Sequence, residues 1–422
     1  MPAPTVYTPP ASKPLFTAAL GARRTPDIEL VYITDRAPRA AQATAQNADP
    51  EATLPYSAER AASMAYGTVS VGFGEAVDWD TLAAQSVAAE RGVDLDLRLG
   101  TTRELGRFPP LRYPLKSAPD GSFHRDPAVL AQHRSAADGL QALLARQLAA
   151  APRKELVLFV HGYANTFQDA AFTMGELCHF FGREFACAVF SWPAGGSRGI
   201  LMGYNVDRES SEFAVLHLKQ ALRIVAATPG LERLHLLAHS RGTSVLVSAL
   251  QQLSIEHYAA GLQPLERMKL RNVVLLAPDI DAQVAGTLLF SVSSDPDLLR
   301  GAHAAPDARL SSGGLQLTLY ASPDDLALSV AERLFGSLRR LGRLDASAFD
   351  EQAYARIADL RNLDLIDVYG STDPFGHSYF HSNPAVSADL VSLIRYGLEP
   401  GDPGRALEEV RRPFWRIREA NR

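Results

Sequence analysis

The chain is poor in cysteine, and it lacks long apolar runs and a strong charge of either sign. Its 422 residues include only two cysteines, Cys178 and Cys187. Their spacing is not that of a metal site, so we predict buried free thiols and no bound metal. We predict no cofactor for this protein. No apolar run approaches the roughly 20 residues that cross a bilayer, which argues against membrane insertion. A net charge of −5 provides no bulk attraction to nucleic acid or to anionic membranes.

The amino terminus lacks the features of a secretory leader. Residues 1–14 are rich in Pro, Ala and Thr and contain neither a basic region nor an apolar stretch. As it stands, the sequence predicts a cytoplasmic protein. A periplasmic protein or a lipoprotein would require that an upstream leader had been removed. The oligomeric state is left open.

What the chain does contain is a regular alternation of apolar segments with helical patterns. The predicted strands cover residues 28–34, 66–73, 155–160, 186–191, 234–237, 272–276, 315–320 and 363–369. The predicted helices cover residues 127–150, 167–181, 209–227, 243–253, 324–335 and 384–396, with another beginning at residue 282. Residues 74–124 show no clear pattern. Residues 40–54 are predicted to form a loop, and long connections at 293–314 and 336–362 are places for a lid or a substrate wall.

Strands that are apolar throughout and alternate with helices indicate an α/β fold with a mostly parallel sheet covered on both faces. We predict one domain over residues 26–400, in which residues 26–150 supply strands, a loop and a helix, and residues 151–400 form the core. Residues 1–25 are predicted to form an extended, proline-rich arm, and residues 401–422 a tail.

Ser240 lies between an apolar strand and a helix, in the pattern Ala238-x-Ser240-x-Gly242. This pattern is close to the G-x-S-x-G nucleophile elbow, a sharp turn that holds a serine hydroxyl beyond the end of a sheet. The first small residue is alanine instead of glycine, while Gly242 keeps the more crowded position. Alone, the pattern is also compatible with a serine that caps a helix.

A serine nucleophile needs a histidine base and a carboxylate, which follow it in the order Ser, acid, His in this kind of turn. His377 lies in the loop after the last predicted strand, and we predict it as the base. His381 is a competitor, but no H-E-x-x-H zinc motif is present. The acid is Asp325 or its neighbour Asp324 after strand 315–320, or Asp279 one strand earlier.

The loop after strand 155–160 is predicted to supply an oxyanion donor. It begins with His161-Gly162-Tyr163, and Gly162 permits a sharp turn near the nucleophile. We predict the backbone N–H groups of Tyr163 and Arg241 as the two donors. His161 is a supporting residue in that loop, as is Trp192 after the next strand.

The chain resembles a bacterial α/β-hydrolase group of unknown physiological role, known as "esterase/lipase superfamily enzyme". The resemblance covers about residues 28–395 and depends on several motifs. They are Val31-Tyr-x-Thr-Asp-Arg36, Tyr66-Gly67, Phe159-Val-His-Gly-Tyr-x-x-x-Phe167, Phe190-Ser-Trp-Pro193, Tyr204-x-x-Asp-x-x-Ser210, His235-Leu-Leu-Ala-His-Ser240, Leu276-Ala-Pro-Asp-Ile-Asp281, Tyr320-x-Ser-x-x-Asp-x-Ala-Leu328, Asp367-Val and Gly376-His-Ser-Tyr379.

Carried over by position, the resemblance implies Ser240 as nucleophile, Asp325 as acid and His377 as base. The family commonly has methionine and asparagine where this chain has Arg241 and Thr243, so the entrance to the site is expected to differ. The expected activity is hydrolysis of a small-molecule carboxylic ester. Alternatives are a lipase, a thioesterase or an amidase on the same site, or a non-catalytic binding or scaffold protein on this fold.

Overall fold

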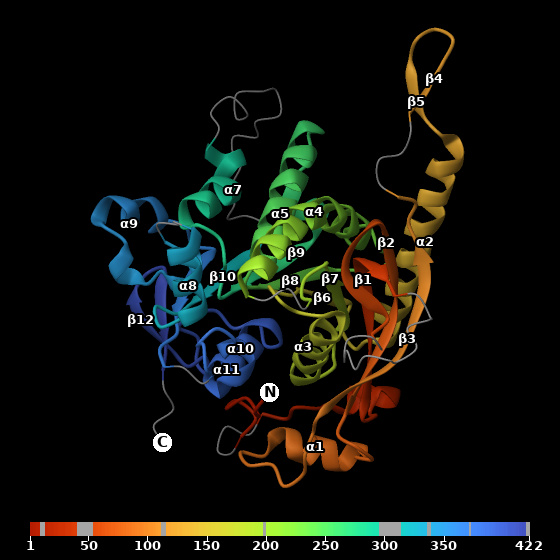
Figure 1. The fold of residues 1–422 in the computed structure, drawn as a ribbon. Coiled ribbons are helices and arrows are strands. Elements are labelled where there is room, and N and C mark those ends of the chain that lie inside the picture. Colours follow the sequence, from red (N-terminus) through yellow and green to blue (C-terminus); the bar gives the residue numbers. More distant parts are fainter. Residues whose placement is uncertain are drawn as a thin grey trace.

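The protein is seen in a computed structural model that describes residues 1–8, 13–39, 54–110, 115–196, 200–294, 314–335, 339–370 and 373–418. Within these residues, one 11-stranded sheet has the order β12-β13-β11-β10-β9-β8-β6-β7-β1-β2-β3 (Figure 1). Its strands are β1 (Asp27–Pro38), β2 (Tyr56–Phe73), β3 (Leu97–Arg107), β6 (Glu155–Val160), β7 (Ala186–Ser191), β8 (Arg233–His239), β9 (Leu270–Leu276), β10 (Gln316–Ala321), β11 (Leu363–Asp367), β12 (Leu407–Arg411) and β13 (Phe414–Ile417).

The centre of the sheet is parallel, and its two ends are antiparallel. Every pair from β1 through β7, β6, β8, β9, β10 and β11 to β13 is parallel, while β2 pairs with β1 and β3, and β12 with β13, in antiparallel register. The mostly parallel α/β sheet predicted from the sequence is therefore confirmed. Because the central strands are parallel, their carboxyl ends lie along one edge, where the loops after β6, β8, β9, β10 and β11 meet.

Helices cover both faces of the sheet (Figure 1). They are α1 (Trp79–Val87), α2 (Pro127–Ala150), α3 (Phe167–Phe180), α4 (Ile200–Ala226), α5 (Gly242–Ala259), α6 (Pro264–Met268), α7 (Ala282–Ser294), α8 (Leu326–Phe335), α9 (Glu351–Ile357), α10 (Tyr379–Ser382) and α11 (Pro384–Ile394). Two hydrophobic cores result. Leu156, Leu158 and Val160 of β6 pack with α2, α4 and α5, whereas Val157 and Phe159 pack on the other face with α3 and α11.

The predicted elements differ from the observed ones mainly at their ends. Helix α2 has the predicted bounds, but α4 begins nine residues before the predicted start at residue 209. The unassigned residues 74–124 contain α1, β3 and a short hairpin of β4 (Leu115–Ser117) and β5 (Phe123–Arg125), which projects beyond α2 in Figure 1. The predicted loop at residues 40–54 and most of the connection at 293–314 lie outside the described residues.

Both terminal segments pack against the rest of the protein. Tyr7 and Leu15 of the predicted extended arm belong to the core on the α3 face, and residues 18–23 form a 3-10 helix. In the region predicted as a carboxyl-terminal tail, β12 and β13 extend the sheet beyond β11, and Trp415 is buried. The sequence signal for these strands is the short apolar pair Phe414-Trp415, which is buried in β13 between β11 and the edge strand β12.

The prediction of free thiols is wrong, because Cys178 and Cys187 form a disulfide. Cys178 lies near the end of α3 and Cys187 near the start of β7. The turn between them reverses the chain, and the two Cα atoms lie 6.2 Å apart, within the range that a disulfide spans. The cysteines are nine residues apart in the sequence, which reveals nothing of this reversal.

Candidate active site

Ser240 occupies a strained turn between β8 and α5. Its φ angle is 50°, in the left-handed region that non-glycine residues seldom adopt. The turn is held by the backbone: the Ser240 N–H donates to the Leu276 carbonyl at 2.9 Å, and the Ser240 carbonyl accepts from the N–H of Asp279 at 3.1 Å. The Thr243 hydroxyl donates to the same carbonyl at 2.6 Å. A strained serine between a strand and a helix is the geometry of a nucleophile elbow.

Two glycines allow the loop after β6 to approach this turn. A Cβ atom added at Gly242 would lie 2.2 Å from the His161 carbonyl oxygen, and one added at Gly162 would lie 2.8 Å from the Cβ of Ser240. Neither position has room for a larger residue without backbone movement. The close approach brings the Gly162 loop directly beside the serine.

His377 and Asp325 are joined by a short hydrogen bond. The Nδ1–H of His377 donates to Oδ2 of Asp325 at 2.6 Å, and the Asp325 side chain is fully buried. Burial lowers the pKa of His377, but the hydrogen bond and charge of Asp325 outweigh it, so the pKa is raised above its ordinary value. The bond leaves Nε2 as the nitrogen that can act as a base. The two residues meet because β10 and β11 are adjacent in the sheet.

The other two candidate acids have different partners. Asp279 is buried and accepts a hydrogen bond from the Tyr204 hydroxyl at 2.8 Å, and its second oxygen lies 3.3 Å from Nε of Arg340. Its charge still contributes to the raised pKa of His377. Asp324 is exposed and accepts from the Gly370 N–H at 3.4 Å. The structure therefore brings Asp325, and neither alternative, into contact with His377, the predicted base.

His239, immediately before the serine, links the elbow to the His377 loop. Its ring centroid lies 4.8 Å from that of His377, and its Nε2–H donates to the His377 carbonyl at 3.1 Å. Burial and the neighbouring His377 hold the pKa of His239 well below its ordinary value, so this ring is neutral. No role was predicted for His239 from the sequence. His381, the competing base, packs its ring against Phe380.

The Ser240 hydroxyl makes no hydrogen bond with the His377 ring among the contacts of the described residues. Catalytic hydrogen bonds are often long outside the substrate complex and shorten when substrate binds. The packing of the His239 and His377 rings nevertheless places the predicted base next to the residue that precedes the serine.

His161 and Trp192 lock the loop after β6 to the loop after β7. The rings stack at 5.2 Å, the Trp192 indole N–H donates to the His161 carbonyl at 2.8 Å, and the Trp192 backbone N–H donates to Nε2 of His161 at 3.0 Å. Nδ1–H of His161 donates to the Gly162 carbonyl at 2.9 Å. Burial and the nearby Arg36 charge hold the pKa of His161 well below its ordinary value. Both side chains are fully buried, so their contacts fix the two loops from inside the protein.

Arg36, at the end of β1, reaches both of these loops. Its guanidinium donates to the Asn165 carbonyl at 2.6 Å, the Ala194 carbonyl at 2.8 Å and the Ser191 hydroxyl at 2.8 Å, and it lies 3.3 Å from Nε2 of His161. The side chain is buried. Sequence reasoning quoted this arginine only within a family motif and assigned it no role.

Asp207 of α4 holds the same two loops through their N–H groups. One carboxylate oxygen accepts from Ala164 at 3.0 Å and from Gly195 at 3.1 Å. Ala164 has a φ of 57°, so the loop after β6 is strained next to the position of the predicted donor Tyr163. Arg36 therefore binds a carbonyl group of this loop, and Asp207 binds one of its N–H groups.

The Arg241 side chain turns toward α4. Nε of Arg241 donates to the Ser211 hydroxyl at 3.1 Å, and its guanidinium lies 3.5 Å from the Glu212 carboxylate. Its backbone lies at the start of α5, where N–H groups have no partner within the helix and the helix dipole is positive. The predicted donor is therefore a main-chain group, and the side chain is directed elsewhere.

Within the described residues, no group of three His, Cys, Asp or Glu side chains is arranged to hold a metal ion. None of the described helices is both long and apolar enough to cross a membrane.

A serine in a strained turn after a central parallel strand, followed by an acid and a histidine at the ends of later strands, defines an α/β-hydrolase. Residues 136–395 match the family model described as "Alpha/beta hydrolase of unknown function (DUF900)". The match covers more than half of the chain, and the chain belongs to this family.

Solved structures are similar to the chain at low sequence identity. An esterase from Pyrobaculum calidifontis is 13% identical over 58% of this chain and 78% of its own, with a TM-score of 0.29. A lipase-esterase related protein from Clostridium acetobutylicum is 13% identical over 58% of this chain and 95% of its own, with a TM-score of 0.30. A phospholipase from Legionella pneumophila is 14% identical over 40% of each chain, with a TM-score of 0.25. No curated protein matches the chain in sequence.

Proposed function

We propose that the protein is a serine hydrolase that cleaves carboxylic esters through an acyl-enzyme intermediate. The observation that carries the proposal is the Asp325–His377 hydrogen bond of 2.6 Å in the loops beside the strained turn at Ser240. An oriented histidine next to a serine in such a turn is the arrangement that makes an alcohol nucleophilic.

In the proposed reaction, Oγ of Ser240 attacks the ester carbonyl while Nε2 of His377 accepts its proton. Asp325 keeps the imidazole in the required tautomer and stabilises the imidazolium that forms. The backbone N–H groups of Arg241 and Tyr163 donate to the oxyanion. His377 then protonates the departing alcohol, and a water molecule, deprotonated by the same ring, releases the acyl group.

Labelling with a fluorophosphonate probe tests the nucleophile. We expect the wild-type protein to be labelled and Ser240→Ala to remain unlabelled, because the probe traps an activated serine. Ser244→Ala, one turn into the same helix, is the matched control and should be labelled like wild type. Equal labelling of wild type and Ser240→Ala, or labelling of neither, would contradict the proposal and favour a binding or scaffold role.

The class of substrate is tested by comparing the rates at which different acyl compounds are hydrolysed. A series of p-nitrophenyl esters of increasing chain length, assayed beside a thioester and an anilide, separates a carboxylesterase from a lipase, a thioesterase and an amidase. We expect the short esters to be cleaved fastest. A preference for the thioester or the anilide would replace the ester in the proposal and leave the nucleophile unchanged.

A further inference from the structure

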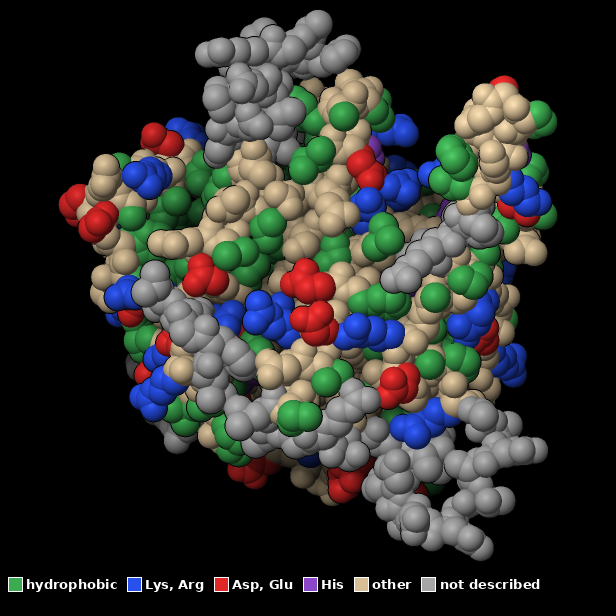
Figure 2. Space-filling model, turned by 45° about the horizontal axis from the view of Figure 1, so that its top comes forward, with side chains coloured by type: hydrophobic (Ala, Val, Ile, Leu, Met, Phe, Trp, Pro, Cys, Tyr) green, Lys and Arg blue, Asp and Glu red, His purple; other side chains and the backbone are tan. Residues whose placement is uncertain are grey.

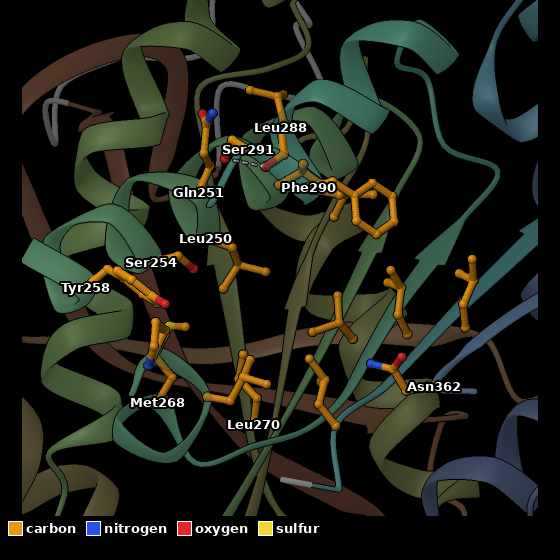
Figure 3. A pocket seen from close by; sticks show the side chains of 18 of the residues that line it. Leu250, Gln251, Ser254, Tyr258, Met268, Leu270, Leu288, Phe290, Ser291 and Asn362 are labelled. Carbon is orange, nitrogen blue, oxygen red and sulfur yellow. Dashed lines mark hydrogen bonds between the residues drawn. The ribbon is translucent and has the colours of Figure 1, made fainter. Parts of the chain in front are cut away.

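Helix α7 stands off the sheet and leaves two neighbouring cavities beneath it. One, of about 180 Å³, lies between α5, α6 and the first residues of β9 and β10 (Figure 3). The other, of about 600 Å³, lies between α7, α9, β10 and β11. Both are lined by Leu289, Phe290, Leu317 and Leu363, so the two cavities adjoin under the helix.

Most of the side chains that line the two cavities are aliphatic or aromatic, and the polar ones include Gln251, Ser254 and Asn362. In Figure 3, Leu250, Leu270, Leu288 and Phe290 surround the smaller cavity, and Figure 2 shows hydrophobic side chains gathered in a hollow of the surface on this side of the molecule. Close-packed interiors leave few such spaces. Apolar cavities of several hundred Å³ with a few polar groups at their edge are typical of small-molecule sites.

Two cations line the larger cavity. Arg339 and Arg356 are both exposed, and neither takes part in an ion pair among the described residues. The neighbouring Arg340, by contrast, is buried beside Asp279. The one acid in the lining, Asp281, accepts the N–H of Gln283 at 2.9 Å at the start of α7. The lining of the larger cavity therefore carries two cations and one carboxylate, and this net positive charge suits an anion.

The cavity is separate from the candidate active site. Ser240, Asp325 and His377 line neither of its two parts. The wall contributed by α5 begins at Val247, two turns after the elbow, and continues to Tyr258 near the other end of the helix. Binding there does not require the proposed nucleophile.

We propose that this cavity binds a single-chain aliphatic carboxylate, with the alkyl chain under α7 and the carboxylate at Arg339 and Arg356. The apolar lining removes the chain from water, and the two guanidinium groups match the charge and planar geometry of the carboxylate. The alkyl chain carries no charge, so the apolar part of the cavity needs no charged side chain to bind it.

The first test blocks the space under α7. A dansyl-labelled undecanoate is titrated into the full-length protein, and its fluorescence reports transfer to an apolar site. Gly286 lines the larger cavity, and a Cβ added there meets no atom within 4 Å, so this position has room for a side chain and Gly286→Leu adds bulk to the cavity lining. Leucine also favours the helix more than glycine does, and circular dichroism checks that the variant folds. We expect saturable binding to wild type and its loss in Gly286→Leu.

Val284 supplies the matched control, because it is exposed on the same helix and does not line the cavity. Val284→Leu should bind the probe like wild type. Binding that survives in Gly286→Leu, or no saturable binding to wild type, overturns the proposal. Ser240→Ala should bind unchanged, so failure of the proposed hydrolase and failure of this site are distinguishable.

The second test concerns the anion. Arg339→Ala and Arg356→Ala should each weaken displacement of the probe by dodecanoate about tenfold and leave displacement by dodecanol unchanged. Arg333→Ala, exposed on α8 and outside the lining, is the control. Equal effects on the acid and the alcohol would overturn the role of the arginines. Sedimentation with phosphatidylglycerol vesicles distinguishes a free fatty acid from a membrane lipid as the ligand. If the protein sediments with the vesicles but does not bind free dodecanoate, the proposal of a free acid is overturned.

Discussion

Asp325 has two partners that together hold it in place. One carboxylate oxygen accepts the Leu328 N–H at 2.9 Å in the first turn of α8, and the other accepts from His377. An aspartate before a helix commonly caps it, and the geometry allows Asp325 both this role and the role of the proposed acid. A carboxylate that is already oriented loses less freedom when the imidazolium forms.

At the residue scale, Asp325→Asn should lower kcat by about a thousandfold or more, because the histidine loses its tautomer and its charge partner. The carboxylate raises the pKa of His377, so its removal should move the acid limb of the pH–rate profile to lower pH. Asp279→Asn should move the limb in the same direction by less and retain most activity. Ester hydrolysis measured across pH, with circular dichroism to check folding, decides between them.

Loss of activity in a folded Asp279→Asn protein, with Asp325→Asn active, would contradict the assignment of the acid. Asp279, which is held by Tyr204 and Arg340, would then act on His377 through its charge, without a hydrogen bond.

At the scale of elements, Arg36 connects the ends of β1, β6 and β7 at the loop that carries the predicted oxyanion donor. Arg36→Lys keeps the charge but cannot reach all these acceptors. A displaced donor affects the transition state more than substrate binding, so we expect kcat to fall about ten- to a hundredfold with little change in KM. Arg24→Lys, which removes an exposed contact to the Thr17 carbonyl, is the control. A rise in KM with kcat unchanged would contradict this positioning role.

The disulfide joins α3 to β7. Closing a loop of about ten residues restricts the unfolded chain by about 2–3 kcal/mol, so reduction should lower the free energy of unfolding by that amount. Urea unfolding with and without reductant measures it. The Cys178→Ser, Cys187→Ser double variant should not respond to reductant. Two reactive thiols in the native wild-type protein would contradict the bond.

The elements themselves were largely predictable, because apolar runs and helical spacing depend on neighbouring residues. Helix α2 and strands β6 and β7 have their predicted bounds. The miss at β12 and β13 has a physical reason: Glu408, Glu409, Arg411 and Arg412 make the segment polar, and only pairing with β11 buries Trp415. Such a strand is stabilised by long-range contacts, which local patterns do not reveal.

At the scale of the whole molecule, the carboxyl-terminal segment is tied to the core by a buried ion pair. Nε of Arg405 lies 2.7 Å from Asp389 of α11, and both side chains are buried. Arg405→Ala leaves the carboxylate without its cation and should cost about 3–5 kcal/mol of unfolding free energy. Arg412→Ala, which removes an exposed pair with Glu409, should cost less than about 1 kcal/mol. Urea unfolding compares them. Equal costs would contradict a structural role for the buried pair.

The sequence by itself determined the order of strands and helices, the turn at Ser240 and the loops in which an acid and a histidine had to lie. These features follow from local spacing and from the conformational demands of small residues. Only the tertiary structure decided which aspartate contacts His377, because that depends on β10 lying beside β11. The contacts of Arg36, the disulfide and the cavity under α7 likewise depend on residues far apart in the chain, which only the packed sheet brings together.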